Sequence, residues 1–192
     1  QAVMEQGRIR TIKHISSLNI RLAKQVIGAA DFALPYLIEN GKFISTLIVS
    51  PPGCGKTTLL RDLIRQLSSG ISSLKLPGHR IGVVDERSEI GACFHGSPQN
   101  DIGPRTDILT GASKVEGIVL LLRSMSPEII ATDEVGSAAD VMVLEEALVS
   151  GVRLISTSHG ESLDDLLLQP VFRDLMQKRL FGRIVCLSSA AG

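Results

Sequence analysis

A glycine-rich stretch from Ser50 to Thr58 constrains the fold of this 192-residue chain more than any other feature. It follows residues 45–49, a short and partly β-branched apolar run that is typical of a strand buried on both faces. It precedes residues 57–67, where leucine and isoleucine recur every three or four positions, as in an amphipathic helix. A strand, a glycine loop and a helix in this order predict a loop that binds the phosphates of a nucleotide.

The residue types in the loop fit this prediction. Glycines let the backbone curl around an anion, and the amides from Gly53 through Thr58, that of Cys54 included, can then donate to phosphate oxygens. Lys56 would reach the β and γ phosphates and the Thr57 hydroxyl would bind magnesium, so we expect ATP and Mg²⁺ as ligands. The nucleotide-binding candidates are Ser50, where the strict pattern has glycine, and Pro51, Pro52, Gly53, Cys54, Gly55, Lys56, Thr57 and Thr58.

The rest of the chain alternates between patterns typical of strands and of helices. We predict strands over residues 80–84, 128–132, 152–157 and 183–187, and helices over 115–125, 138–149 and 161–169. Such alternation predicts an α/β fold, a P-loop NTPase with a RecA-like core whose mainly parallel sheet carries helices on both faces.

The N-terminal part has a different pattern. Residues 3–22 are typical of short strands with a turn near residues 5–7, and residues 31–41 are typical of a helix that ends at glycine. We therefore expect residues 1–30 to be the end of a strand-rich segment that begins upstream, and residues 31–192 to form the P-loop ATPase domain.

Two of the predicted strands end in acidic residues. The strand over 128–132 is followed by Asp133 and Glu134, which resemble the second acidic motif of P-loop NTPases. Asp133 would hold magnesium through water, and Glu134 could orient or deprotonate an attacking water. A solvated acidic turn is the alternative. The other acidic strand end, Asp85 and Glu86, lies between the two nucleotide motifs.

This arrangement resembles the secretion ATPases of type II and type IV systems, which carry an acidic box between their two Walker motifs. Glu86 matches the central acid of that box, residues 122–127 are similar to the leucine-arginine stretch before the second motif, and residues 157–160 look like the family's histidine box. The resemblance implies that Glu86 and Glu134 are both candidates for the catalytic acid. It also implies that His159 could sense the γ phosphate, although a structural histidine is the alternative.

The sequences of residues 50–62, 84–90 and 123–128 resemble the stage III sporulation AA family more closely still. This resemblance implies a cytoplasmic ATPase in the mother cell of endospore-forming bacteria, peripheral to a membrane-embedded channel complex. Its relation to the secretion ATPases implies a homo-oligomeric ring, such as a hexamer. Where secretion ATPases commonly have glycine, this chain has Asp133, which leaves the magnesium ligands and the catalytic acid open.

Charge that develops on the γ phosphate calls for an arginine, which in ring ATPases often comes from the neighbouring subunit. The candidates are Arg87, Arg105 and Arg123, and Arg105 lies in a long segment, residues 91–107, with little periodicity. For each of them, a role as an ordinary surface arginine is the alternative.

Composition limits the remaining functions. Lysine and arginine number 20, as do aspartate and glutamate, and the chain has five phenylalanines, one tyrosine and no tryptophan. Nucleic acid is therefore not expected as a partner, because binding it needs basic and aromatic surface. A RecA-like nucleic-acid translocase and an ATP-gated scaffold with little turnover remain the alternatives to a motor ATPase.

Overall fold

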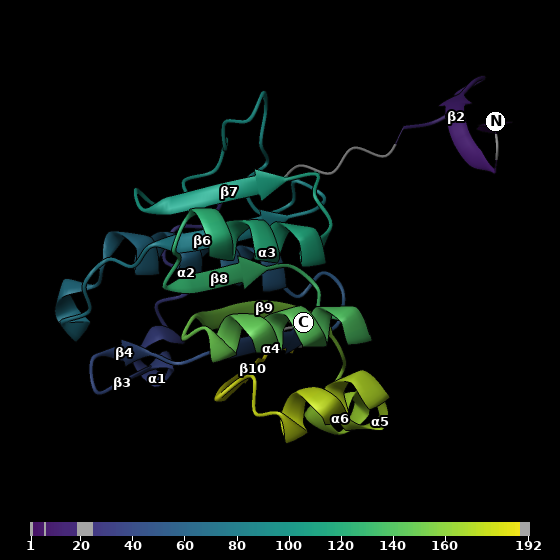
Figure 1. Ribbon diagram of the computed structural model, residues 1–192. Helices are drawn as coiled ribbons and strands as arrows, with labels where there is room; N and C mark the ends of the chain where they lie inside the picture. The colour runs from purple at the N-terminus through teal and green to yellow at the C-terminus, as the bar shows by residue number, and fades with distance from the viewer. Residues whose placement is uncertain (1, 6, 19–24, 189–192) are drawn as a thin grey trace.

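A six-stranded parallel sheet forms the centre of the computed structural model, which describes residues 2–5, 7–18 and 25–188 (Figure 1). The strand order is β10-β5-β9-β8-β6-β7, and every neighbouring pair is parallel. This confirms the predicted α/β class. The strands are β5 (Thr46–Ser50), β6 (Ile81–Asp85), β7 (Thr106–Thr110), β8 (Ile129–Thr132), β9 (Arg153–His159) and β10 (Arg183–Cys186).

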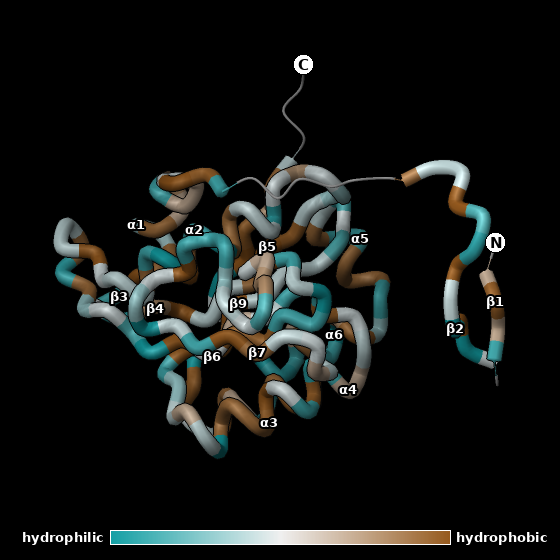
Figure 2. Tube along the Cα trace, turned by 90° about the horizontal axis from the view of Figure 1, so that it is seen from above, coloured by the Kyte–Doolittle hydropathy of each residue, from teal (hydrophilic) through white to brown (hydrophobic). Residues whose placement is uncertain are grey.

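Helices cover both faces of the sheet, as the parallel topology requires. Seen from above, α1 and α2 lie on one side of the strands, and α3 and α4 lie on the other (Figure 2). Successive side chains along a strand point to opposite faces of the sheet. Ile48 of β5 therefore packs into the core beneath α2, while Leu47 and Val49 pack beneath α3 and α4. The helices are α1 (Leu34–Leu37), α2 (Lys56–Ser69), α3 (Lys114–Ser124), α4 (Ala138–Val149), α5 (Leu163–Leu168) and α6 (Pro170–Gln177), with a 3₁₀ turn at Ser72–Leu74.

A glycine sets how closely α3 lies on the sheet. A Cβ atom at Gly117 would stand 2.7 Å from Cγ1 of Val84, closer than side-chain packing allows. The helix therefore rests directly on β6, and its first residue, Lys114, comes to the carboxyl edge of the sheet.

Three predicted elements were wrong in part. The helix expected over residues 31–41 is only the short α1, because Asn40 and Gly41 take left-handed φ values of 52° and 72° and turn a small hairpin between β3 (Ile38–Glu39) and β4 (Lys42–Phe43). The segment 91–107, predicted to be irregular, ends in β7. Pro170 ends α5 as expected but also begins α6, which the prediction lacked, because proline suits the first turn of a helix.

The N-terminal part contains the expected strands, β1 (Ala2–Glu5) and β2 (Arg8–Ile12), which pair as an antiparallel hairpin. The rest of the predicted strand segment falls partly on residues 19–24, outside the described residues. Ala30 is fully buried, and its amide donates to Oδ2 of Asp62 on α2 at 2.9 Å. Residue 30 therefore already packs with the core, while the division of the chain into residues 1–30 and 31–192 stays a prediction.

Candidate nucleotide-binding site

Most of the candidate residues meet at the carboxyl ends of the central strands. The glycine loop leaves β5 at Ser50, and His159 ends the neighbouring β9, where the sheet register pairs these two residues directly. Asp133 and Glu134 follow β8, the next strand in the sheet. In open α/β sheets ligands bind at this edge, so the sheet order brings together motifs that are about a hundred positions apart in sequence.

The glycine loop has the backbone that a phosphate-binding loop needs. Gly53 and Gly55 have φ values of 80° and 87°, in the left-handed region that favours glycine, and Gly55 directly precedes α2. The Lys56 side chain is buried over the loop, where its Nζ donates to the carbonyls of Ser50 at 2.8 Å and Pro51 at 3.0 Å. Burial of its ammonium lowers the pKa of Lys56 below the ordinary value.

A cavity of about 270 Å³ lies against the loop. Thr57 and Asp133 both line it, so a hydroxyl and a carboxylate face the same space. This pair fits a magnesium ion, which usually keeps several waters and takes one or two protein oxygens together with substrate phosphates. Among the described residues, no group of three or more histidine, cysteine or acidic side chains is placed to hold a metal ion.

A chain of polar contacts crosses the site from the loop to the second acidic motif. Nδ1 of His159 lies 3.0 Å from Lys56 Nζ, and its Nε2 contacts the Glu134 carboxylate. Glu134 also pairs with Arg87, whose NH1 is 3.3 Å from Oε2. His159 thus joins the lysine of the loop to the predicted catalytic acid, and its role as a sensor of the γ phosphate stays a prediction.

The backbone at Glu134 has an unusual conformation. Its φ of 40° lies in the left-handed region, which costs a residue with a side chain about 1–2 kcal/mol. The Glu134 amide donates to Oδ1 of Asp133 and to Oγ1 of Thr157, both at 3.0 Å. Thr157 in turn donates to Asp133 Oδ1 at 2.6 Å. Such backbone strain concentrates at functional sites and persists where neighbouring groups hold it.

Glu86, the other candidate acid, lies beside the loop cavity and not in its lining. Its Oε1 accepts from the amide of Lys114 at 2.9 Å, and it lines a neighbouring cavity of about 350 Å³ that also contains Glu134. Asp85 is fully buried and accepts from the amides of Glu89, Ile90 and Gly91, which is a structural role. The catalytic role of Glu86 stays a prediction.

Two of the candidate arginines, Arg105 and Arg123, lie toward the amino ends of the strands, away from the site. Arg105 donates to the carbonyl of Ser68, near the end of α2 and about 18 Å along that helix from Lys56. Arg123 is exposed in the last turn of α3. Neither reaches the site of this chain, and their action on a neighbouring subunit stays a prediction. Arg87 is the candidate that the structure brings to the site.

Sequence reasoning missed three residues that support the site, Lys114, Asp140 and Thr157. Lys114 and Asp140 lie in the first turns of α3 and α4, which begin after the capping serines Ser113 and Ser137. The capping pattern in the sequence could have indicated both helix starts, but not the contact between the two side chains. Thr157 was noted only as part of the histidine box.

The fold and the site together define a P-loop protein with the fold of the secretion ATPases. The X-ray structure of the Legionella pneumophila ATPase DotB superposes with a TM-score of 0.54 at 18% sequence identity, covering 76% of this chain and 37% of DotB. A likeness at this level of identity establishes the fold alone. The chain itself belongs to the family described as sporulation stage III, protein AA, whose family model matches residues 1–192.

Two curated relatives show the range of this similarity. The stage III sporulation protein AA of Bacillus subtilis (strain 168) is 44% identical over 192 residues, which is the whole of this chain and 62% of the relative. The protein SEEDLING PLASTID DEVELOPMENT 1 of Arabidopsis thaliana is 28% identical over 84% of this chain and 22% of that protein. The chain therefore spans less than two thirds of either relative. Within the described residues, no helix has the length and apolar character needed to cross a membrane.

Proposed function

We propose that this chain is a magnesium-dependent ATPase, a motor subunit that powers or gates a membrane-associated channel complex during endospore formation. The observation that carries the proposal is the convergence of Lys56, Asp133, Glu134 and His159 around one cavity at the carboxyl edge of the sheet. Membership of a sporulation family and the fold of secretion ATPases support the biological setting. In this setting we expect a cytoplasmic protein that is peripheral to a membrane complex of the mother cell.

Each residue around the cavity has a defined part in the proposed reaction. The amides of the loop and the Lys56 ammonium would hold the β and γ phosphates, and Thr57 and Asp133 would hold magnesium. Magnesium, when bound, would supply positive charge that offsets the negative charge of the phosphates. Glu134 would accept a proton from the attacking water, because it faces the same cavity as the loop. We propose Glu134 as the base and Glu86 as a supporting acid.

His159 would couple the nucleotide to the rest of the site. In this structure it contacts both Lys56 and Glu134, so a γ phosphate that draws Lys56 toward itself would also change the partners of His159. We further propose a homo-oligomeric ring, such as a hexamer, in which Arg105 or Arg123 reaches the site of a neighbouring subunit. Its other partners would be membrane-embedded sporulation channel proteins.

ATP turnover measured against protein concentration, alongside molecular mass in solution, tests this proposal. We expect Mg²⁺-dependent turnover that rises with assembly, and a loss of about 100-fold or more in Glu134→Gln with nucleotide binding retained. Binding without turnover, even with the membrane partner present, would indicate an ATP-gated scaffold instead. Salt-dependent binding of DNA at micromolar concentration would indicate a nucleic-acid translocase.

A further inference from the structure

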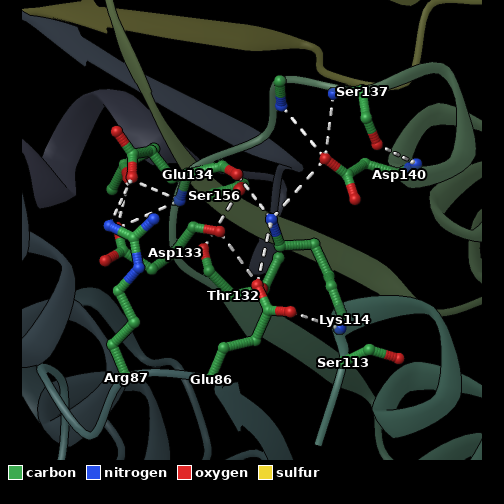
Figure 3. Close-up of polar contacts among 12 residues, drawn as sticks. Glu86, Arg87, Ser113, Lys114, Thr132, Asp133, Glu134, Ser137, Asp140 and Ser156 are labelled. Atoms are coloured by element: carbon green, nitrogen blue, oxygen red, sulfur yellow. Dashed lines mark hydrogen bonds and ion pairs between the residues drawn. The ribbon is translucent and has the colours of Figure 1, made fainter. Parts of the chain in front are cut away.

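Lys114, the first residue of α3, lies buried among groups from three other elements (Figure 3). Its Nζ donates to the backbone carbonyl of Glu134 after β8, and stands 3.6 Å from Oδ2 of Asp140 on α4 and 3.8 Å from Oε2 of Glu86 after β6. Its own amide donates to the other oxygen of Glu86 at 2.9 Å. A single ammonium therefore joins the acidic box, the second acidic motif and the start of α4.

Both sides of the Glu134 residue are held by hydrogen bonds. Thr157 and Asp133 accept from its amide, and Lys114 donates to its carbonyl. Between these two points the backbone adopts the left-handed φ of 40°. A residue with a side chain keeps this conformation only where its surroundings hold it, and Lys114 supplies the contact on the carbonyl side.

The carboxylates around Lys114 are also committed to other partners. Asp140 accepts from the amides of Gly136 and Ser137, both at 3.0 Å, in the capping box that starts α4. Because Asp140 is fixed in this way, it holds the ammonium at a defined place relative to the turn over residues 133–137. The lysine is thus anchored to two helices while it bonds to the strained residue.

We propose that Lys114 is a positioning residue that fixes the Glu134 backbone in its left-handed conformation, so that the Glu134 carboxylate faces the loop cavity. Lys114 itself does not line that cavity. It acts through Glu134, and through its two bonds to Glu86 it ties the position of the proposed base to the acidic box. The expected effect on ATP turnover rests on the proposed function. The expected effect on the Glu134 backbone rests on geometry alone.

The kinetic test uses Lys114→Met, which keeps much of the length of the side chain and removes the charge. We expect kcat for ATP to fall about 10- to 100-fold, as a misplaced catalytic group implies, while nucleotide affinity changes less than about threefold. In a Glu134→Gln background the same substitution should reduce the residual turnover less than about twofold, because its effect passes through Glu134. Equal losses in both backgrounds would overturn the proposal.

Lys178→Met is the matched control. Lys178 also pairs with two carboxylates, those of Glu145 on α4 and Asp174 on α6, at 2.7 and 3.4 Å, but it has no contact with the turn over residues 133–137. Its variant should keep wild-type turnover. If Lys114→Met does not fold, Lys114→Gln replaces it, because its shorter, uncharged amide remains polar and removes the ammonium.

Hydrogen exchange provides a test that needs no turnover. In Lys114→Met the amides of residues 134–137 should exchange at least about tenfold faster than in the wild type, while those of β5 and of the Lys178→Met variant should not change. Unchanged protection over residues 134–137 would overturn the proposal whether or not the protein hydrolyses ATP. Absence of turnover in the wild type together with faster exchange in the variant would refute the proposed function and leave the positioning role standing.

Discussion

The substitution Thr157→Val tests whether the hydroxyl of Thr157 positions the Asp133 carboxylate. The Thr157 hydroxyl is fully buried and donates to the Asp133 carboxylate at 2.6 Å. A hydrogen bond to a charged group contributes about 1.5–3 kcal/mol, and the added methyl group of valine returns about 1 kcal/mol. The Glu134 amide keeps Asp133 as an acceptor, so no donor is left unpaired.

The net loss is therefore about 0.5–2 kcal/mol of unfolding free energy, which corresponds to a fall in Tm of about 1–8 °C for a domain of this size. The functional loss should be larger, because Asp133 is the proposed magnesium ligand and removing a hydrogen bond that supports a metal ligand typically weakens metal binding about 10- to 100-fold. Thermal unfolding and a Mg²⁺ titration of nucleotide binding measure the two effects. Thr157→Ser keeps the hydroxyl and is the control, and equal Mg²⁺ dependence in the two variants would refute the reasoning.

Three further predictions follow from single contacts. Lys56→Met should weaken ATP binding by at least about tenfold, measured by equilibrium titration, since it removes the ammonium that faces the loop cavity. For Asp62, burial alone would raise the pKa, but hydrogen bonds and the charge of Arg65 lower it overall. The ionised Asp62 carboxylate therefore stabilises the fold fully above its pKa in the unfolded chain, and this contribution is lost as pH falls through its lower pKa in the folded protein. In urea unfolding, Asp62→Asn should be less stable than the wild type by about 2 kcal/mol at neutral pH, and this difference should shrink in acid. Gly103→Ala should lower Tm far more than Gly111→Ala, because both have positive φ but only at Gly103 would a Cβ clash, 2.5 Å from Ser68 Cβ.

The sequence predicted the parts of the fold that depend on local patterns. The glycine loop, the apolar strand before it and the helix after it lie where their residue types require, and α4 matches its predicted bounds of residues 138–149. The edge strand β7 was missed because only two of its five residues are apolar and its partly exposed side chains give no clear alternation. The hairpin at Asn40 and Gly41 was missed although its turn dipeptide is a known signal, because the helical spacing before it dominated the interpretation.

The site was predictable only where a motif marked a residue. The glycine loop follows β5, the two acids follow β8 and His159 ends β9, so their meeting at one edge follows from a parallel sheet. Lys114 could not be placed in the same way, because its contacts depend on how closely α3 packs on β6 at Gly117. Arg105 shows the converse, since its place in a long segment pointed to the site while its guanidinium bonds at the far end of α2.

The pairing of Ser50 with His159 across β5 and β9 predicts that the carboxyl edge of the sheet tolerates changes in chain length poorly and the amino edge tolerates them better. Deleting one residue of β9 ahead of His159 would shift the imidazole by about 3.3 Å and turn it to the opposite face of the sheet. The exposed turn around Lys75 lies at the other edge, where no strand end contributes to the site. Reporter tags and fluorescent probes inserted there should therefore leave nucleotide binding intact, which makes this turn a practical attachment point for testing the proposed assembly.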